Sequence, residues 1–422
     1  MSLLRGESMK KYLVPAIAFV MIVAGAFTAH AEWVKNGSDY YYYDDNNQLV
    51  TNQIVEDEYY VDSTGKMGTN IWVKAQDGDG TYYFYFGDNG KMIRDKWKTI
   101  NDKTYHFNDD GHMETGWILD NMYFCHLDDG HMLKGWQRLE DPQDDMKKNE
   151  PFADDSNIHW YYFGASGRKT CAENTDYAEK RIDDKRYCFN NLGQLQTGWV
   201  KFGNNEEGIG DYKYFDENGA DHIGWYSLNP PEELANNYAY DVMWFYFNNN
   251  GTPAYDPDGI PTIGDLKRLD NKRYYFNVWG TPVWGLKKMY TSTDGSNYET
   301  YFFGTFNQSC VQHGKFQIYD GTEEKSTFCF AESGSGTTGV KDGSLYYKGL
   351  LQKASKDCTY EVIRVNNVNY LVSTAGKVEK NKTVKDRDGV KWTTNASGIV
   401  TKKDGEQYSG TGRDPEPPSF QG

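Results

Sequence analysis

A short motif recurs along this chain about every twenty residues. In its clearest copy, the aromatic run Tyr105-His106-Phe107 leads through polar residues to Gly111-His112-Met113 and then to Gly116-Trp117. The next copy keeps Gly130-His131-Met132 and Gly135-Trp136, which places its tryptophan 19 residues after the first. A unit this short cannot bury a hydrophobic face alone, so the repeats must stack on one another to form a shared core.

The composition of the repeats favours β-hairpins over helices. Aromatic residues make up 16% of the chain, and its 43 glycines fall largely in turns rich in Asp and Asn. Aromatic runs bounded by Asp, Asn and Gly are typical of strands and tight turns. We therefore predict an all-β repeat solenoid in which each unit is one hairpin stacked on the next.

Degenerate copies of the motif extend from Tyr41 to Trp392, about fifteen in all, and leave no stretch large enough for an ordinary catalytic domain. Two proline-containing segments interrupt the period, and we expect them to form side loops or partner sites. The predicted organisation is a signal peptide (1–31), N-terminal hairpin repeats (32–137), an irregular insertion (138–157), central repeats (158–340) with a loop insertion near 226–241, C-terminal repeats (341–404) and a disordered tail (405–422).

The N-terminus predicts export. Lys10 and Lys11 precede an apolar run from Leu13 to Phe27, and Ala29-His30-Ala31 has the small-x-small pattern of a cleavage site. The run is too short to span a membrane. We therefore expect a secreted protein, associated with a cell wall or cell surface and without membrane insertion.

Acidic residues dominate the charged surface. The whole chain carries a formal charge of −16; residues 1–31 carry +2, so the remainder carries about −18. This balance argues against nucleic acid or anionic lipid as the partner and fits a neutral glycan or a cationic group. The alternative interpretation is that the acidic residues simply solubilise an aromatic-rich surface.

The six cysteines allow two interpretations. Cys125, Cys188 and Cys329 occupy hairpin positions where other units carry aromatic residues or His, which is typical of core substitutions. The pairs Cys171 with Cys188 and Cys310 with Cys329 each lie about one unit apart, so stacked neighbours could be bridged.

Other apparent motifs do not predict a catalytic, cofactor or metal site. The Gly-x-Gly-x-x-Gly match at 334–339 lies in a turn with no βαβ pattern around it. Asp77-Gly78-Asp79-Gly80 lacks calcium-loop spacing and fits a turn. The histidines, including His126 and His131, form no zinc-type array and fit surface or stacking roles. We expect neither cofactor nor metal.

The repeats resemble the cell-wall-binding repeats, of choline-binding and glucan-binding type, found in Gram-positive surface proteins, streptococcal glucosyltransferases and large clostridial toxins. The resemblance covers residues 33–403 and rests on the Gly-Trp pair, the aromatic hairpin and the Gly-x-Met segment. It implies a superhelical solenoid with ligand sites in grooves between consecutive units. It also implies a non-catalytic, adhesive role.

In the choline-binding branch, the resemblance implies a cage formed by the Gly-Trp indole, a Trp that opens the next hairpin, a further hairpin aromatic residue and a Met. The opening Trp is present only at Trp160 and Trp244, so most choline cages would be incomplete. Sugars need fewer aromatic platforms, together with hydrogen-bonding groups. The candidate ligand-binding residues are Trp117, Trp136, Trp160, Trp199, Trp225, Trp244, Tyr105, Tyr162, Met113 and Met132.

Three function classes remain open. The first is a secreted protein that binds cell-wall or extracellular polysaccharide, with choline-bearing polymers as a variant. The second is a structural or adhesive spacer, in which the tryptophans simply fill the core between hairpins. The third is a hydrolase with a divergent catalytic region. Retention on purified wall separates the first from the second, and hydrolysis of that material would identify the third.

Overall fold

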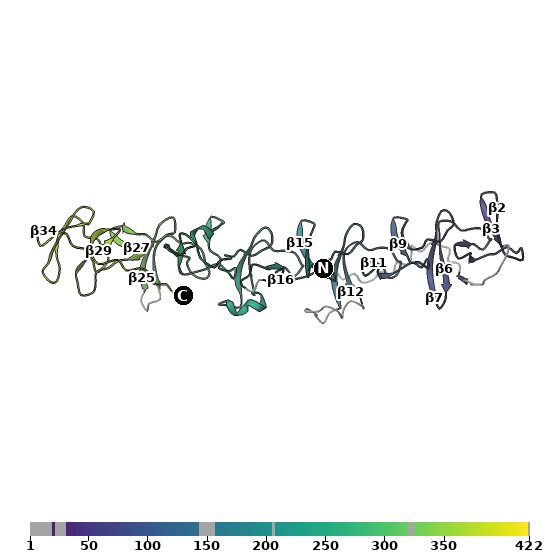
Figure 1. The fold of residues 1–422 in the computed structure, drawn as a ribbon, viewed down its shortest axis with the longest axis horizontal. Helices are drawn as coiled ribbons and strands as arrows, with labels where there is room; N and C mark the ends of the chain where they lie inside the picture. Colours follow the sequence, from purple (N-terminus) through teal and green to yellow (C-terminus); the bar gives the residue numbers. More distant parts are fainter. Residues whose placement is uncertain (1–18, 22–30, 143–156, 205–206, 320–324, 421–422) are drawn as a thin grey trace. The chain divides into compact units, whose positions relative to one another are not determined.

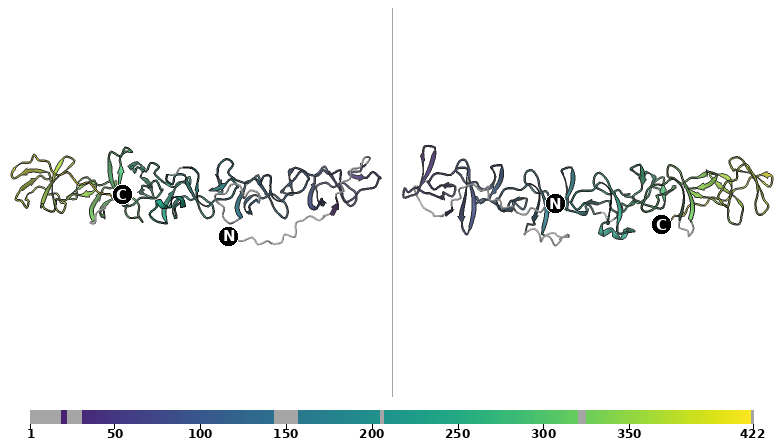
Figure 2. Two further views of the ribbon diagram at one scale, coloured as in Figure 1. Left: turned by 60° about the horizontal axis from the view of Figure 1, so that its bottom comes forward. Right: turned by 180° about the vertical axis from the view of Figure 1, so that it is seen from behind.

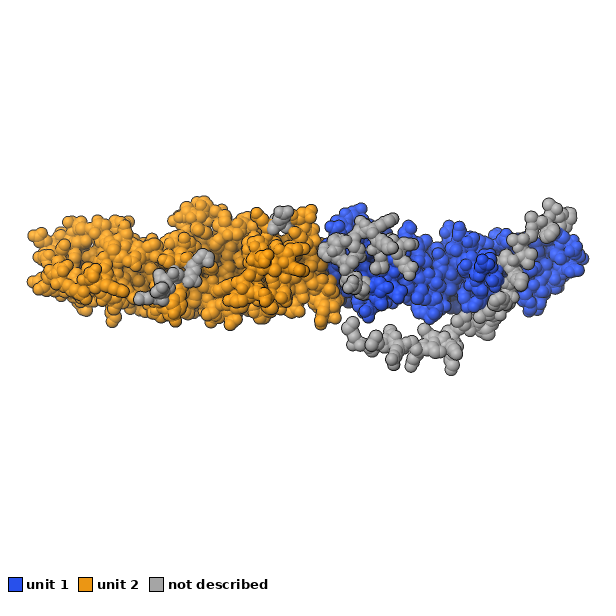
Figure 3. Space-filling model, turned by 90° about the horizontal axis from the view of Figure 1, so that it is seen from below, with its two compact units in different colours: residues 1–196 blue, residues 197–422 orange. Residues whose placement is uncertain are grey.

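Paired antiparallel strands account for nearly all regular structure in this protein (Figure 1). The computed structural model describes residues 19–21, 31–142, 157–204, 207–319 and 325–420. These residues form two compact units, 1–196 and 197–422, coloured separately in Figure 3. No helix in the described ranges is long and apolar enough to span a membrane.

The first unit consists of hairpins whose two strands follow one another directly in the sequence. Its strands are β1 (Phe19–Met21), β2 (Glu32–Asn36), β3 (Asp39–Tyr43), β4 (Gln53–Val55), β5 (Tyr59–Val61), β6 (Ile71–Asp77), β7 (Gly80–Phe86), β8 (Lys96–Ile100), β9 (Lys103–Phe107), β10 (Gly116–Ile118), β11 (Tyr123–Cys125), β12 (Gly135–Glu140), β13 (Ile158–Phe163), β14 (Tyr177–Ile182) and β15 (Lys185–Asn190).

The second unit begins with the same pattern and adds two short 3-10 helices, η1 and η2. Its elements are β16 (Gly198–Lys201), β17 (Tyr212–Phe215), β18 (Gly224–Leu228), η1 (Glu232–Asn237), β19 (Met243–Phe247), η2 (Ile263–Asp265), β20 (Lys267–Leu269), β21 (Lys272–Tyr274), β22 (Leu286–Tyr290), β23 (Tyr298–Phe302), β24 (Gly314–Tyr319), β25 (Lys325–Phe330), β26 (Gly339–Lys341), β27 (Ser344–Tyr347), β28 (Leu350–Leu351), β29 (Tyr360–Val365), β30 (Val368–Ser373), β31 (Thr383–Lys385), β32 (Lys391–Thr394), β33 (Val400–Lys403) and β34 (Glu406–Gln407).

Consecutive hairpins are linked by the segment that comes after each second strand. After β9, the amide of Met113 donates to the carbonyl oxygen of Tyr83 in the preceding hairpin at 2.8 Å. After β11, the amide of Met132 donates in the same way to Thr104 at 2.8 Å. Figures 1 and 2 show consecutive hairpins side by side within each unit. The predicted all-β architecture of stacked hairpin repeats is therefore confirmed.

The turn glycine and the methionine of the Gly-x-Met segment belong to one packing device. At Gly130, φ is +72°, and a Cβ would lie 2.5 Å from the thioether sulfur of Met113 in the preceding repeat. At Gly167, φ is +79°, and a Cβ would lie 2.2 Å from the sulfur of Met132. Glycine is required there because the backbone is left-handed and a methionine already occupies the space.

The cores lie between the hairpins as small aromatic clusters. Phe86, Phe107, Phe163, Phe189 and Phe215, each at or next to the end of the second strand of its hairpin, are completely buried. Because side chains alternate across a strand, the residue two positions earlier faces the same cluster.

The repeats from β24 onward depart from the predicted hairpin-by-hairpin pattern. Strands β24 to β28 form one five-stranded sheet in the order β24-β25-β28-β27-β26, and β31 to β34 form a four-stranded sheet. In the first sheet, β28 inserts between two hairpins because only Lys348 and Gly349 separate it from β27.

The tail predicted to be disordered (405–422) is ordered through residue 420. Strand β34 pairs with β33, and the guanidinium Nε of Arg413 donates to Glu361 at 2.8 Å. The amide of Glu416 donates to the side-chain oxygen of Gln352, also at 2.8 Å. The proline-rich composition suggested disorder, but these polar contacts with the preceding repeats hold the segment in place.

Two other predicted segments are described only in part. Of the predicted signal peptide, only Phe19–Met21 and Ala31 are described, and Phe19–Met21 form β1, which pairs in parallel with β6. Of the insertion at 138–157, residues 143–156 lie outside the described residues. The insertion near 226–241 is described in full and contains part of β18 and the helix η1.

Candidate functional site

Each Gly-Trp tryptophan lies at the second position of a first strand, half-buried beside the next hairpin. In β12, Trp136 pairs across its own hairpin with Tyr162, their ring centroids 5.1 Å apart. It also contacts the next hairpin. The inter-hairpin centroid distances are 5.0 Å for Trp72–Tyr105, 5.1 Å for Trp97–Tyr123, 4.9 Å for Trp117–Tyr161, 4.8 Å for Trp136–Tyr187, 5.1 Å for Trp199–Phe245 and 4.9 Å for Trp225–Tyr274.

The aromatic residues of one hairpin therefore contact two tryptophans, one in the preceding hairpin and one in their own hairpin. Along β13, Tyr161 and Phe163 face back to Trp117, at 4.9 and 5.9 Å between centroids. The intervening Tyr162 faces Trp136 of its own hairpin. This division results from the alternation of side chains across a strand.

The opening tryptophans do not join the grooves in the way that the resemblance implied. Trp160 is exposed opposite Arg138, whereas Trp117 contacts Tyr161 and Phe163, the second and fourth residues of that aromatic run. Trp244 is 44% exposed and contacts Trp225 of its own hairpin edge-on at 6.4 Å. The expected combination of the Gly-Trp indole with the opening Trp of the next hairpin is not observed at Trp117. Trp160 lies one position away from Tyr161 and therefore on the opposite face of the strand.

The interface between β6–β7 and β8–β9 contains Trp72, Tyr105 and Met113, and we call this candidate site the Trp72 groove. Its three members pack in one cluster with the buried Tyr85. Burial, together with the charge of Asp129, raises the pKa of the Tyr105 phenol, although Lys103 acts in the opposite direction. Tyr105 and Met113 were among the candidate residues, whereas Trp72 was not, because no Gly precedes it.

The remaining candidates occupy different surroundings. Met132 packs on Gly167 of the following repeat and thereby serves the inter-hairpin packing device. Trp225 contacts Tyr246 across its own hairpin at 5.4 Å, in addition to the next hairpin. In the Trp225 cluster, the buried Cys310 packs beside Tyr274.

Trp199 lies under the insertion near 226–241. Its indole N–H donates to the carbonyl oxygen of Asn229 at 2.8 Å. Leu234 of η1 is buried in the same cluster, and Tyr238 packs against Phe245 at 6.0 Å between centroids. The insertion, expected to be a side loop or partner site, thus covers this groove with hydrophobic side chains.

The groove between β10–β11 and β12–β13 contains a lysine that the sequence analysis did not single out. The ammonium of Lys169 lies 4.9 Å from the Trp117 ring centroid and 5.7 Å from that of Tyr161. The Trp117 indole N–H donates to the carbonyl oxygen of Glu140 at 2.9 Å. We call this site the Trp117 groove. Its signal in the sequence is that Lys169 replaces the Met of the Gly-x-Met segment.

A buried carboxylate, that of Asp141, forms hydrogen bonds with Tyr161 of the Trp117 groove and with residues around it. The Tyr161 hydroxyl donates to Asp141 at 2.6 Å, and the amide nitrogen of Gln194 donates to the second Asp141 oxygen at 3.0 Å. His159 lies 2.8 Å from the same carboxylate through Nδ1. Asp141 is 8% exposed, so these polar partners satisfy a charge removed from water.

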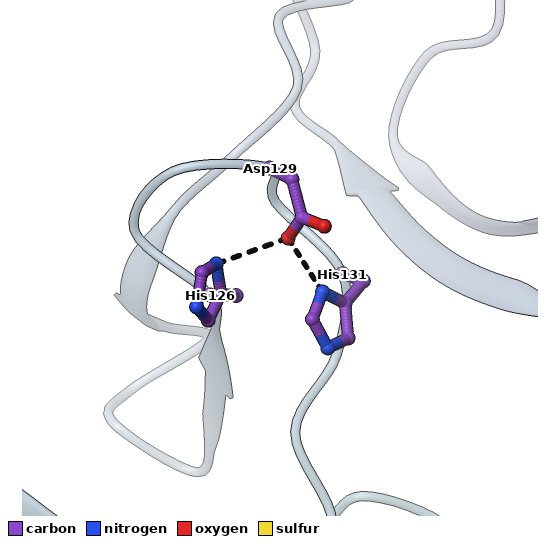
Figure 4. A group of neighbouring side chains, drawn as sticks. All are labelled: His126, Asp129 and His131. Carbon is purple, nitrogen blue, oxygen red and sulfur yellow. Dashed lines mark hydrogen bonds and ion pairs between the residues drawn. The ribbon is translucent and has the colours of Figure 1, made fainter. Parts of the chain in front are cut away.

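Two histidines and an aspartate meet beside the Trp72 groove (Figure 4). The Nδ1 atoms of His126 and His131 lie 3.0 and 2.5 Å from one oxygen of Asp129. Their rings stack at 5.1 Å, in keeping with the expected stacking role, but the shared carboxylate was not foreseen. Burial would raise the Asp129 pKa, but hydrogen bonds from Lys103 and His131 outweigh it and lower that pKa to about 2.

Side chains of these kinds bind Zn²⁺ in proteins, although no metal was expected from the spacing of the histidines. Here Lys103 engages the second oxygen of Asp129 at 2.8 Å, and Tyr105 forms a β-bridge to His131. These contacts join β8–β9 to the segment after β11. We therefore interpret the cluster as a link between two hairpins that holds Tyr105 in the Trp72 groove.

Comparison with known proteins identifies the repeats. Residues 95–135 match the choline-binding repeat family, and residues 158–169 match the cell wall binding repeat family. Glucosyltransferase-S of Streptococcus mutans is 24% identical over 287 residues, which are 60% of this chain and 17% of that protein. The resemblance inferred from the sequence is confirmed.

Several solved structures from Streptococcus pneumoniae are similar at lower sequence identity. The modular autolysin LytC, in complex with a synthetic peptidoglycan ligand, is 20% identical, with a TM-score of 0.37 over 62% of this chain and 50% of its own. Choline binding protein F is 20% identical, with a TM-score of 0.35 over 78% of this chain and 99% of its own. CbpJ is 20% identical, with a TM-score of 0.36 over 78% and 100%.

Proposed function

Because this chain carries choline-binding and cell wall binding repeats, we propose that it binds cell-wall or extracellular polysaccharide through its inter-hairpin grooves. In this proposal its role is adhesive and not catalytic, and it acts outside the cell, at a wall or surface. The observation that carries the proposal is the Trp72 groove, where a half-buried indole, a tyrosine and a methionine from two hairpins converge.

The chemistry of the groove suits a sugar ring. The apolar face of a pyranose stacks on an indole, while nearby polar side chains bind its hydroxyls. Polar groups are available close by, since Lys103 and Asp129 lie beside Tyr105. The acidic balance of the chain disfavours polyanions as partners.

A choline-bearing wall polymer is the second candidate ligand. One observation favours it: in the Trp117 groove, the ammonium of Lys169 rests against Trp117 and Tyr161. The Gly-Trp indole and the tyrosine facing it thus form a surface that holds a cation. A quaternary ammonium over aromatic faces is attracted by up to about 2 kcal/mol at a desolvated site.

The test is retention of the full chain on purified Gram-positive wall and on soluble glucan, with and without choline as competitor. Trp72→Ala should lower retention, and Trp72→Phe should lower it less, because the phenyl ring keeps part of the stacking surface. Trp160→Ala is the matched control, since the structure places Trp160 outside the Trp72 groove.

Retention of all variants at the wild-type level, each with an unchanged strand spectrum, would refute the Trp72 groove as the binding site. Failure of the wild-type chain to be retained would favour a spacer. Elution by choline would select the choline-bearing ligand, and elution only by glucan would select the neutral one. Release of soluble sugar from the wall by the wild-type chain would instead identify a hydrolase.

A further inference from the structure

Lys169 occupies a position that four earlier repeats fill with methionine. The Gly-x-Met segments end in Met67, Met92, Met113 and Met132, whereas the next repeat reads Gly167-Arg168-Lys169. The backbone of this repeat makes the same kinds of contact as in the repeats that carry methionine. Phe163 forms a β-bridge to Lys169 just as Phe107 does to Met113. The Lys169 amide donates to the preceding hairpin, at Met122, at 2.8 Å.

The aliphatic stem of Lys169 also takes over the packing role of methionine. A Cβ on Gly193 would lie 2.8 Å from the Cδ of Lys169, as a Cβ on Gly167 would lie 2.2 Å from the Met132 sulfur. The lysine therefore keeps the contact with the next turn and adds a charge at its end. Long lysine stems commonly pack against apolar surface in this way.

That charge is directed into the Trp117 groove. Lys169 is 7% exposed, and its ammonium approaches two rings from different hairpins, Trp117 at 4.9 Å and Tyr161 at 5.7 Å. The Tyr161 hydroxyl donates to the buried Asp141, which makes the ring more electron-rich. A desolvated ammonium over such rings is attracted more strongly than one at the surface.

We propose that Lys169 is a built-in cationic occupant of the Trp117 groove and closes it to external quaternary ammonium ligands. The Trp72 groove, which has Met113 at the equivalent position, remains available to such a ligand. This inference rests on the choline-bearing variant of the proposed function. Lys169 thereby sets which grooves of the first unit engage a cationic ligand.

Lys169 competes well with a free cationic ligand because it is tethered beside the groove. A side chain held beside its site acts at an effective concentration of about millimolar or more, which a dilute free ligand does not match. If the lysine occupies the groove nine-tenths of the time, the apparent affinity for an external cation falls about tenfold. Replacing Lys169 by methionine should therefore uncover a cage that the fold already contains.

The experiment is a titration of the full chain with tetramethylammonium and with radiolabelled choline, followed by equilibrium dialysis and tryptophan fluorescence. Lys169→Met should bind one more probe molecule per chain than the wild type, with an affinity at this groove at least about tenfold higher. Lys169→Met combined with Trp117→Phe should lose much of that gain. Lys74→Met is the matched control, because Lys74 lies over the single ring of Tyr83.

The outcomes separate this inference from the proposed function. If Lys169→Met gains no site while Trp72→Phe weakens choline binding in the wild type, the lysine does not close the groove. If Lys169→Met gains a site and Trp72→Phe has no effect on wall retention, the inference stands and the assignment of the Trp72 groove fails. If Lys169→Met loses its strand spectrum, Lys169→Leu provides the same test with a different apolar stem, and failure of both to gain a site overturns the proposal.

Discussion

Trp72 of the first unit and Trp199 of the second unit both occupy the second position of a first strand, but their surroundings differ. Both indoles face an aromatic residue of the next hairpin, at 5.0 Å for Tyr105 and 5.1 Å for Phe245. Over Trp199, however, the insertion near 226–241 supplies the carbonyl oxygen of Asn229, which accepts a hydrogen bond from the indole N–H, and buries Leu234. The repeat thus supplies a stacked indole, and the loop of the neighbouring hairpin decides whether that indole serves as core or as groove.

The largest expected effect is on stability at the covered site. Trp199→Ala should cost about 3 kcal/mol of unfolding free energy in the second unit, because it removes a half-buried indole that packs in a hydrophobic cluster, together with its hydrogen bond. Trp72→Ala should cost about 1 kcal/mol less, since no equivalent cover or indole hydrogen bond is lost with it. Thermal denaturation followed by circular dichroism measures both. Equal losses of stability would break the comparison.

Binding should show the opposite order. If several weak grooves act together, a long wall polymer should bind about 10²–10⁴ times more tightly than a short oligosaccharide. Replacing Trp72, Trp136 and Trp225 by Phe, one at a time and then together, should lower polymer affinity in steps, whereas Trp199→Phe should leave it nearly unchanged. Surface plasmon resonance with polymer and oligosaccharide measures this. An affinity that is the same for both ligands would rule out cooperation among grooves.

Acid should loosen the neighbourhood of the Trp72 groove. The Asp129 pKa is lowered to about 2 in the folded chain, below its ordinary 3.8. Its contribution to stability is therefore complete above pH about 4 and is lost as the pH falls towards 2. We expect a loss below about 1 kcal/mol, because the carboxylate is partly exposed. Asp129→Asn should remove this part of the pH dependence, and a wild-type dependence in the variant would contradict the assignment.

Salt should have a small effect on binding. The proposed contacts are stacking and neutral hydrogen bonds, so retention on neutral polysaccharide should change little between low and moderate ionic strength. The same retention assay at increasing sodium chloride measures it. A steep loss would indicate a cationic wall component held by the acidic surface, and the Trp72 groove would then not be the main contact.

Reduction should have the smallest effect. The residues that the structure describes contain no disulfide bond, and Cys125, Cys188, Cys310 and Cys329 are buried. Burial raises the pKa of the Cys125 thiol to about 12, so little reactive thiolate is present at neutral pH. The melting temperature should be the same with and without reductant. A large drop would show that the bridges considered for Cys171–Cys188 and Cys310–Cys329 form and support the stack.

Much of the candidate site could be foreseen from the repeats, because a period of two within each strand dictates which residues share a face. This holds for Tyr162 beside Trp136 and for Met113 near Tyr105. The resemblance did not predict the position of Trp160. It implied a cage that includes this residue, but the Trp160 side chain lies on the opposite face of the strand from Tyr161. The roles of Lys169 and Asp141 depend on contacts between hairpins and could not be read from local spacing.

The all-β repeat architecture follows from local sequence, since aromatic runs, turn glycines and a period near twenty residues admit little other than stacked hairpins. The surroundings of each indole, in contrast, depend on contacts between repeats. Trp72 lines a groove, Trp117 holds a lysine of its own chain and Trp199 lies under an insertion. Local pattern sets the direction of a side chain, but the residues that meet it come from other repeats, and their approach depends on packing between hairpins.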